Sequence, residues 1–276
     1  MATRKDYNEI AVKAARSVLL ELGHLLGEYR EDIVLVGGWV PEFIFPDKVK
    51  PHCGSIDVDL ALDHRKLQEQ GYKSIQKLLL SRGYEQGKQP FIFYRRVTIE
   101  NQEVTVEIDL LAGEYEGTGK GHRTQKMQDI RARKARGCDL AFDMSMELPV
   151  EGELPGGGRD SITIRVASIV PFLIMKGMAL EDRLKEKDAW DIYYCILNYP
   201  GGLDALVEKF RPYLQHGLVQ EGLQKIAKHF ASESQVGPKY VADFEEITGP
   251  GEREMMQRDA YERVNYILKK LSIIRG

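Results

Sequence analysis

The sequence predicts an α+β fold, in which a mixed sheet with flanking helices is followed by a helical domain. Three observations support this prediction. Short strand-like runs alternate with helical stretches up to about residue 166, a Pro-Gly-Gly-Gly loop lies within 153–160, and the sequence after residue 167 has mainly helical periodicity. We therefore expect two domains, residues 1–166 and 167–276, with the seam between about 165 and 200.

The expected elements follow from the spacing of apolar residues and from the glycines and prolines between them. In the first domain they are a helix over 7–30, strands over 33–36 and 55–62, a short helix over 39–45, a helix over 64–82, a hairpin formed by 91–99 and 103–111, and a strand over 161–166. In the second domain we expect helices over about 167–184, 188–197 and 253–274, with a break at 199–202.

The composition is that of a globular protein. The chain has 276 residues, of which 43% are hydrophobic and 29% charged, and its formal net charge is −3, which argues against a polybasic protein. The three cysteines are widely separated and form no CxxC pair, so neither a zinc knuckle nor a disulfide framework is expected. No leader-like or membrane-spanning apolar run is present, and we expect a cytoplasmic protein with no membrane partner.

Two acids, Asp57 and Asp59, stand two residues apart in an expected strand, so their side chains project from the same face. Two neighbouring anions repel each other unless a cation lies between them, and Mg²⁺ or Mn²⁺ suits an oxygen-only donor pair. The alternative is an exposed strand face with two solvated acids. The preceding pair Gly37-Gly38 leads from a strand into a short helix, a turn that suits either phosphate binding or ordinary chain reversal.

A third acid, Asp109, lies in a later strand, where alternation places it on the same face as Glu107. Three acids on neighbouring strands beside a glycine turn are typical of metal-dependent phosphoryl transfer.

The order of these segments resembles the polymerase-β-like nucleotidyltransferase superfamily, whose pattern is a glycine pair, a DxD on the following strand and a third carboxylate on a later strand. Lys176–Ala179 and Arg183–Asp191 are similar to the Lys-x-x-Ala and Arg-x-Lys-x-Lys-Asp-x-x-Asp segments of its AbiEii-like branch. That branch includes nucleotidyltransferase toxins of toxin–antitoxin and phage-defence systems. The resemblance covers roughly residues 30–197.

The resemblance implies a nucleotidyltransferase-like fold, with Asp57, Asp59 and Asp109 as catalytic ligands of Mg²⁺ or Mn²⁺. It further implies a nucleotide-binding set: Gly37, Gly38, Ser55, Lys176 and Asp188. Two residues depart from the family pattern: Trp39 replaces a small hydroxyl residue, and Cys53 stands where many relatives carry a basic residue.

Lys187 is added to the nucleotide-binding set on helical geometry. On an unbroken helix, Lys176, Arg183 and Lys187 lie within about 40° of one another and face one anion. Asp191 would steady Lys187 on that helix. A helix break within the charged run 181–188 would remove this arrangement.

Residues 120–136 are strongly basic. They contain seven Lys or Arg residues and one acid, a local formal charge of +6 against −9 for the remainder of the chain. This separation favours a phosphate-rich partner such as RNA, in particular a tRNA acceptor. The alternative is a solvated surface helix with no ligand.

These observations predict an enzyme that moves NMP from an NTP to an acceptor hydroxyl in a cleft between the domains and releases pyrophosphate. A tRNA 3′ end, a protein hydroxyl and a small alcohol of the aminoglycoside type are all compatible acceptors, and a toxin of this kind would have an antitoxin protein as partner. The alternative is a catalytically degenerate nucleotide-binding or partner-binding protein.

Overall fold

The computed structural model describes residues 3–45, 50–68, 74–115 and 122–274. By its internal contacts the chain divides into two units, one comprising Tyr7–Phe43 and Cys53–Ser168, the other Met1–Asp6, Ile44–His52 and Ile169–Gly276. The described residues 3–6, 44–45 and 50–52, which precede residue 167, belong to the unit that contains the helices.

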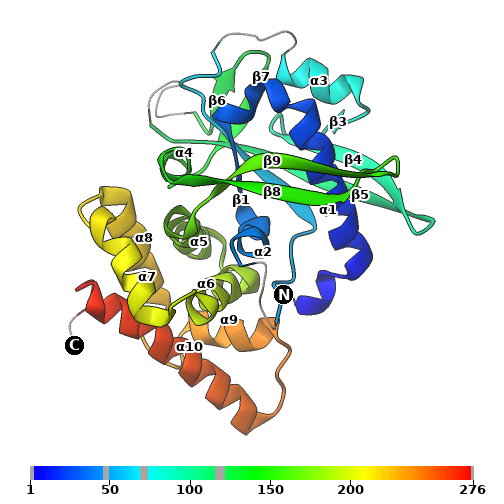
Figure 1. Cartoon of the computed structure of the whole chain (residues 1–276). Coiled ribbons are helices and arrows are strands. Elements are labelled where there is room, and N and C mark those ends of the chain that lie inside the picture. The colour runs from blue at the N-terminus through cyan, green and yellow to red at the C-terminus, as the bar shows by residue number, and fades with distance from the viewer. Residues whose placement is uncertain (1–2, 46–49, 69–73, 116–121, 275–276) are drawn as a thin grey trace. The chain divides into compact units, whose positions relative to one another are not determined.

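The first unit is built on a mixed sheet, and the expected α+β class is confirmed (Figure 1). Its main path runs β3-β4-β5-β2-β1-β9-β8, and β7, paired with β6, joins β5. The strands are β1 Ile33–Val36, β2 Asp57–Leu62, β3 Glu85–Gln86, β4 Ile92–Ile99, β5 Gln102–Ala112, β6 Thr124–Met127, β7 Ile130–Lys134, β8 Ser145–Glu153 and β9 Arg159–Ala167. Strand β2 is antiparallel to β1 and parallel to β5, so the sheet is mixed at its centre.

Helix α1, Glu9–Leu25, packs across one face of this sheet, where it contacts β2, β4, β5, β8 and β9 (Figure 1). The Asn8 side chain caps it by accepting the Ala11 backbone N–H, which explains why the helix begins there. The expected helix over 7–30 ends early, since Gly27–Asp32 forms a tighter 3₁₀ helix before β1.

The hairpin expected from 91–99 and 103–111 is present as β4 and β5. Its turn residues Glu100 and Asn101 both have positive φ, 50° and 64°. That is the backbone of a type I′ turn, whose twist matches the twist of the flanking strands.

The expected helix over 64–82 is wrong in its first half. Helix α3 begins only at Ile75 and ends at Ser81, with the Ser74 side chain as its N-cap. Upstream, the Asp63 carboxylate accepts both the backbone N–H and the guanidinium of Arg65, which favours a turn over a helix. Residues 69–73 lie outside the described part of the chain.

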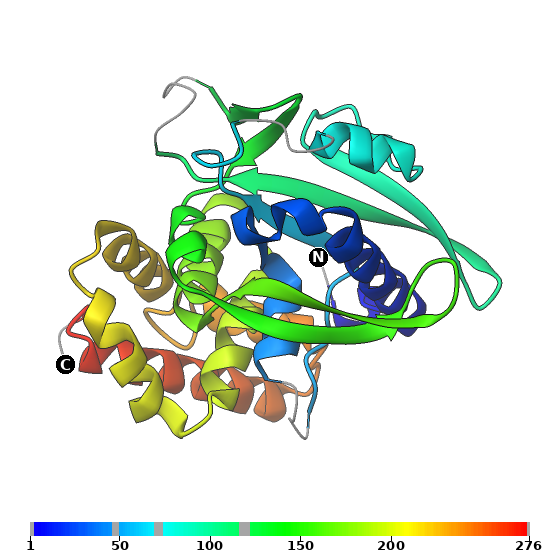
Figure 2. The same cartoon turned by 45° about the horizontal axis from the view of Figure 1, so that its top comes forward.

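The basic segment forms the β6–β7 hairpin and not a helix (Figure 2). The helix of the alternative is therefore wrong, and binding of a phosphate-rich partner stays a prediction. Strand alternation buries one side of the hairpin and exposes the other. The buried residues are Gln125, Met127, Ile130 and Ala132. Lys120, which the sequence analysis included in this segment, lies outside the described residues. Strand β8 was not expected; its polar composition and Pro149 suit the edge position that it occupies.

The second unit is helical. Its helices are α5 Ile169–Arg183, α6 Glu186–Asn198, α7 Gly202–Phe210, α8 Gly217–His229, α9 Val236–Phe244 and α10 Pro250–Lys270, and Figure 2 shows α10 in red. Helices α5 and α8 approach closely at Gly177, which has no side chain. A Cβ atom at this position would lie only 2.7 Å from the Gly222 carbonyl oxygen. Within the described residues no helix is both long and apolar enough to span a bilayer.

Two short elements of the first unit complete the description. Gly37–Trp39 forms a 3₁₀ turn that continues into α2, Val40–Ile44, at the position of the short helix expected over 39–45. Helix α4, Asp139–Asp143, contacts β1 and β9.

Candidate active site

The acids predicted as metal ligands lie on two adjacent strands. In the parallel pairing of β2 with β5, Asp57 is opposite Glu107 and Asp59 is opposite Asp109. Paired residues project from the same side of a sheet, and residues two apart on a strand do so as well. The structure therefore brings the four carboxylates to one sheet face. Leu60 and the other alternate residues point to the opposite face, which α1 covers.

The glycine turn lies directly against the second acid. Val36, the last residue of β1, is paired with Asp59, and Gly37 follows with φ +70°. A Cβ atom on Gly37 would lie 1.9 Å from Asp59 Oδ2. Only a glycine leaves room for this carboxylate and adopts this backbone without strain.

Replacing Gly37 by Ala is expected to reduce the free energy of unfolding by about 1 kcal/mol through its φ and by a further ~1–3 kcal/mol through collision with Asp59. Gly157→Ala is the matched control, since Gly157 has φ +83° but no atom near the added Cβ. Urea unfolding of both variants measures the difference. Equal losses would show that the contact with Asp59 is unimportant.

Trp39 and Ser55 fix the start of β2. The Trp39 indole N–H donates to the Asp57 carbonyl oxygen at 2.8 Å, which ties the glycine turn to the acidic strand. The buried Ser55 hydroxyl donates to Asp57 Oδ1. Trp39, which departs from the family pattern, thus has a structural role. Ser55, expected to contact phosphate, orients the first carboxylate, and Gly38 is buried in the turn.

The third acid has a partner that the sequence analysis did not identify. Arg133 Nη2 lies 2.5 Å from Asp109 Oδ2, and the guanidinium also lies over the Phe91 ring, 5.9 Å from its centroid. Beside it, burial raises the pKa of Glu107; a hydrogen bond from Tyr94 lowers it, and the charges of Asp109 and Asp57 raise it further.

The oxygen donors Asp57, Asp59 and Asp109 fit a hard cation such as Mg²⁺ in chemistry and in their shared face. In the described ranges, however, no group of three or more His, Cys, Asp or Glu residues is arranged to hold a metal ion. The acids therefore lie on adjacent strands, but their carboxylates are not close enough together to form a metal site. Metal binding stays a prediction.

The β6–β7 hairpin adds cations to the same sheet face. Lys126 is paired directly with Arg131, and Arg133 follows two residues later on the same side. Because Arg133 pairs with Leu111 of β5, two residues after Asp109, this side continues the face that carries the acids. The arrangement places positive charge next to a row of carboxylates, within one unit of the fold.

No protein-family model matches the chain, and no curated protein matches it in sequence. Two solved structures from Helicobacter pylori are similar to it. One is JHP933, with 12% sequence identity and a TM-score of 0.48 over 96% of this chain and 94% of that chain. The other is described as a candidate nucleotidyltransferase, with 13% identity and a TM-score of 0.40 over 92% of this chain and 96% of that chain. The function is therefore inferred from the site's own residues.

The other predicted nucleotide contacts lie in the helical unit. The helix break within 181–188 that the sequence analysis considered is present, because α5 ends at Arg183, α6 begins at Glu186, and Leu184 between them has φ 47°. The shared helical face of Lys176, Arg183 and Lys187 is therefore absent. Lys176 and Lys187 are nevertheless gathered around the chain's own acids, both buried. Their contact with nucleotide stays a prediction.

This buried charge cluster has two acidic centres. Asp188 accepts from Lys176 Nζ at 2.9 Å and from Arg183 Nε at 2.7 Å. Asp191 lies 2.6 Å from Lys176 Nζ, 2.8 Å from Lys187 Nζ and 2.8 Å from His52 Nε2. The anion that the three cations face is therefore supplied by the protein.

The cluster shifts the pKa values of its members. Burial alone would raise the pKa of Asp191, but Lys176 and Lys187 outweigh it and hold that pKa well below the usual range. Burial, and then the charge of Lys187, lower the pKa of His52 from 6.5 to about 4, so this imidazole is neutral near pH 7. His52 is packed between the rings of Trp190 and Tyr194.

The free energy of unfolding is expected to fall as the pH is lowered from 6.5 to about 4. In this window His52 binds a proton in the unfolded chain but not in the folded protein. Its contribution to the free energy of unfolding therefore falls by about 1.4 kcal/mol for each pH unit below 6.5, and is fully present only above pH 6.5. Urea unfolding across this range measures the slope. His52→Phe is expected to flatten it, and an equal slope in both proteins would contradict the assignment.

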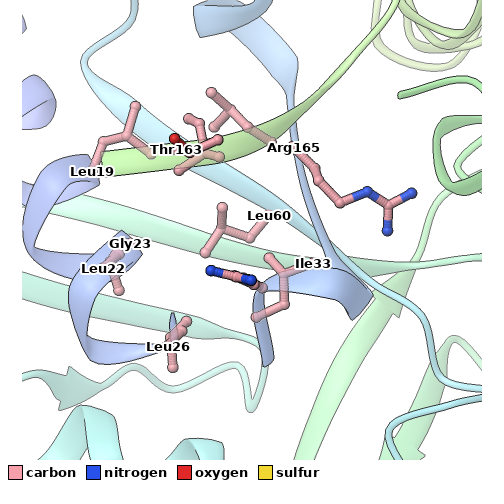
Figure 3. Close-up of a pocket in the computed structure, with 11 residues that line it drawn as sticks. Leu19, Leu22, Gly23, Leu26, Ile33, Leu60, Thr163 and Arg165 are labelled. Atoms are coloured by element: carbon pink, nitrogen blue, oxygen red, sulfur yellow. The ribbon is translucent and has the colours of Figure 1, made fainter. Parts of the chain in front are cut away.

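A cavity on the other side of the sheet is not part of this site. It lies between α1 and strands β1, β2 and β9, with an apolar lining that includes Leu19, Leu22 and Leu60 (Figure 3). Leu60 points away from the face of Asp57 and Asp59, so a ligand in this cavity would not meet the acids.

Proposed function

We propose that this protein is a metal-dependent nucleotidyltransferase that transfers NMP from an NTP to an acceptor hydroxyl and releases pyrophosphate. The observation that carries the proposal is the placement of Asp57, Asp59 and Asp109 on one face of adjacent strands, with Asp59 against the Gly37 turn. Acids in this arrangement suit phosphoryl transfer because they would hold divalent metal ions, which stabilise the negative charge that the transition state spreads over the phosphate oxygens.

Asp57, Asp59 and Asp109 would hold Mg²⁺ or Mn²⁺, which when bound neutralises triphosphate charge and makes the acceptor hydroxyl more acidic. The chain's own residues position these ligands. Ser55 orients the Asp57 carboxylate by donating its hydroxyl hydrogen, and the side-chain-free Gly37 leaves space beside Asp59. Lys176, Lys187 and Asp188 are proposed as further nucleotide-binding residues.

For the acceptor we propose an RNA, of which a tRNA 3′ end is one form. Support comes from Lys126, Arg131 and Arg133, which lie on the sheet face that carries the acids and offer a row of cations to a phosphate backbone. The resemblance to the AbiEii-like branch extends the proposal to a toxin that an antitoxin protein would neutralise. A small alcohol of the aminoglycoside type is the second candidate acceptor.

The proposal is tested by incubating the purified chain and Mg²⁺ with each NTP in turn, labelled at the α-phosphate, and with total RNA, total protein or an aminoglycoside. We expect label to enter RNA together with pyrophosphate release. Label in the aminoglycoside or in protein would correct the acceptor. NTP binding without pyrophosphate release in all three mixtures would show a degenerate nucleotide-binding protein instead.

A further inference from the structure

The third carboxylate of the candidate site is bonded to a cation of the chain itself. Arg133 Nη2 is 2.5 Å from Asp109 Oδ2, and Asp109 is paired in register with Asp59 on the neighbouring strand. The Asp109 side chain is 13% exposed and that of Arg133 is 40% exposed. The guanidinium therefore reaches from solvent toward a nearly buried acid, at the point where a bound metal ion would draw the carboxylates together.

The sheet, and not a loose loop, holds the Arg133 backbone in this position. Arg133 and Lys134 pair with Leu111 and Ala112 at the end of β5. The buried Gln125 side chain on β6 donates to the Gly113 carbonyl oxygen at 3.1 Å, just beyond these pairs. With the backbone fixed, only the long side chain is free to leave Asp109, by rotation toward solvent.

We infer that Arg133 is a resident counterion of Asp109 that competes with the divalent metal ion for this carboxylate. The inference rests on the proposed function. Asp109 would serve as a metal ligand only after its oxygen is released from the guanidinium, which would then turn toward solvent on the same face of the hairpin. Arg133 thus sets the metal concentration at which the third carboxylate joins the site.

The partial exposure of Arg133 makes such an exchange feasible. A guanidinium locked in a fully buried pair would be costly to remove, whereas the Arg133 side chain is 40% exposed and is readily rehydrated when it leaves Asp109. Arg133 is a positioning residue in this account, because it acts on the ligand Asp109 and not on the nucleotide.

The test is Mn²⁺ binding to the full chain without nucleotide, measured by the loss of the free Mn²⁺ signal in electron paramagnetic resonance. Arg133→Gln is expected to bind Mn²⁺ about fivefold more tightly than the wild-type protein, the change that a partly exposed ion pair would supply. Arg131→Gln is the matched control, since it removes the same charge from the same hairpin face two residues away. It is expected to change Mn²⁺ affinity by less than about twofold, because screening weakens more distant charges.

Arg133→Lys is a conservative variant that keeps a positive charge but lacks the planar guanidinium, so it tests whether the effect of Arg133→Gln comes from a folding defect. We expect its Mn²⁺ affinity to lie between those of the wild-type protein and Arg133→Gln. Equal affinity of Arg133→Gln and Arg131→Gln, or weaker binding by Arg133→Gln, would overturn the inference. Asp59→Asn separates this failure from that of the proposed function. If Asp59→Asn weakens Mn²⁺ binding but Arg133→Gln equals its control, only the counterion role is wrong; if Asp59→Asn has no effect, both are wrong.

Discussion

Replacing Asp59 by Asn is expected to reduce nucleotidyl transfer more than about a hundredfold while leaving the melting temperature unchanged or higher. Asp59 lies on the central strand β2, between the glycine turn on one side and Asp109 on the other. Its carboxylate is therefore the one that neighbours all other parts of the candidate site. Asn keeps the volume and removes the charge. It also removes repulsion between neighbouring carboxylates, which is why stability should not fall. Label transfer to RNA and thermal unfolding measure the two effects.

Glu103→Gln is the matched control for this variant. Glu103 lies on β5, on the same side as Asp109 but six residues earlier, and is exposed. It undergoes the same chemical change outside the acidic group, and we expect normal transfer and normal stability. Full activity in Asp59→Asn would remove the proposed mechanism, whereas a strong loss of stability would show that Asp59 serves the fold.

The sequence was sufficient to predict which acids share a face within each strand. Strands have a side-chain period of two, so Asp57 with Asp59, and Glu107 with Asp109, could be assigned to common faces before any pairing was known. That these two faces are one face depends on the parallel register of β2 and β5, which no local pattern encodes.

Arg133 shows why the rest of the site could not be predicted. It stands 24 residues after Asp109 in a run of basic residues, several of which were equal candidates for the same contact. The choice among them is made by the pairing of β7 with the end of β5. The contact depends on which residues of β7 pair with β5, and local patterns in a single sequence do not reveal that pairing.

The shared helical face considered for Lys176 and Lys187 is absent for a different reason. Helical periodicity relates their directions only while the helix continues, and Leu184 takes a left-handed conformation that ends it. The break allows Arg183 to bond Asp188 across the corner between α5 and α6. Lys176, Arg183 and Lys187 are brought together by ion pairs with Asp188 and Asp191 around the junction of α5 and α6. Helical periodicity does not describe such pairs.

Replacing Asp191 by Asn is expected to destabilise the protein by about 3–5 kcal/mol. Asp191 has no solvent exposure and lies within 2.8 Å of Lys176, Lys187 and His52 nitrogens. A neutral amide would remove the carboxylate that lies 2.8 Å from the buried Lys187 ammonium and would leave Lys176 with Asp188 alone. Urea unfolding followed by far-ultraviolet circular dichroism measures the loss. Glu262→Gln, which breaks an exposed pair with Arg258, is the control and should cost less than about 0.5 kcal/mol.

A second substitution separates the structural role of this cluster from nucleotide binding. Lys187→Met in the Asp191→Asn protein removes the buried ammonium group that faced Asp191, so we expect it to recover part of the lost free energy of unfolding. A double-mutant cycle isolates this coupling. If Lys187 also contacts nucleotide, the rescued protein will fold but bind NTP more weakly than the wild-type protein. Wild-type NTP affinity in the rescued protein would show that Lys187 only stabilises the helices. A cost for Asp191→Asn as small as that of Glu262→Gln would show that the cluster is solvated and that its charges are not held by one another.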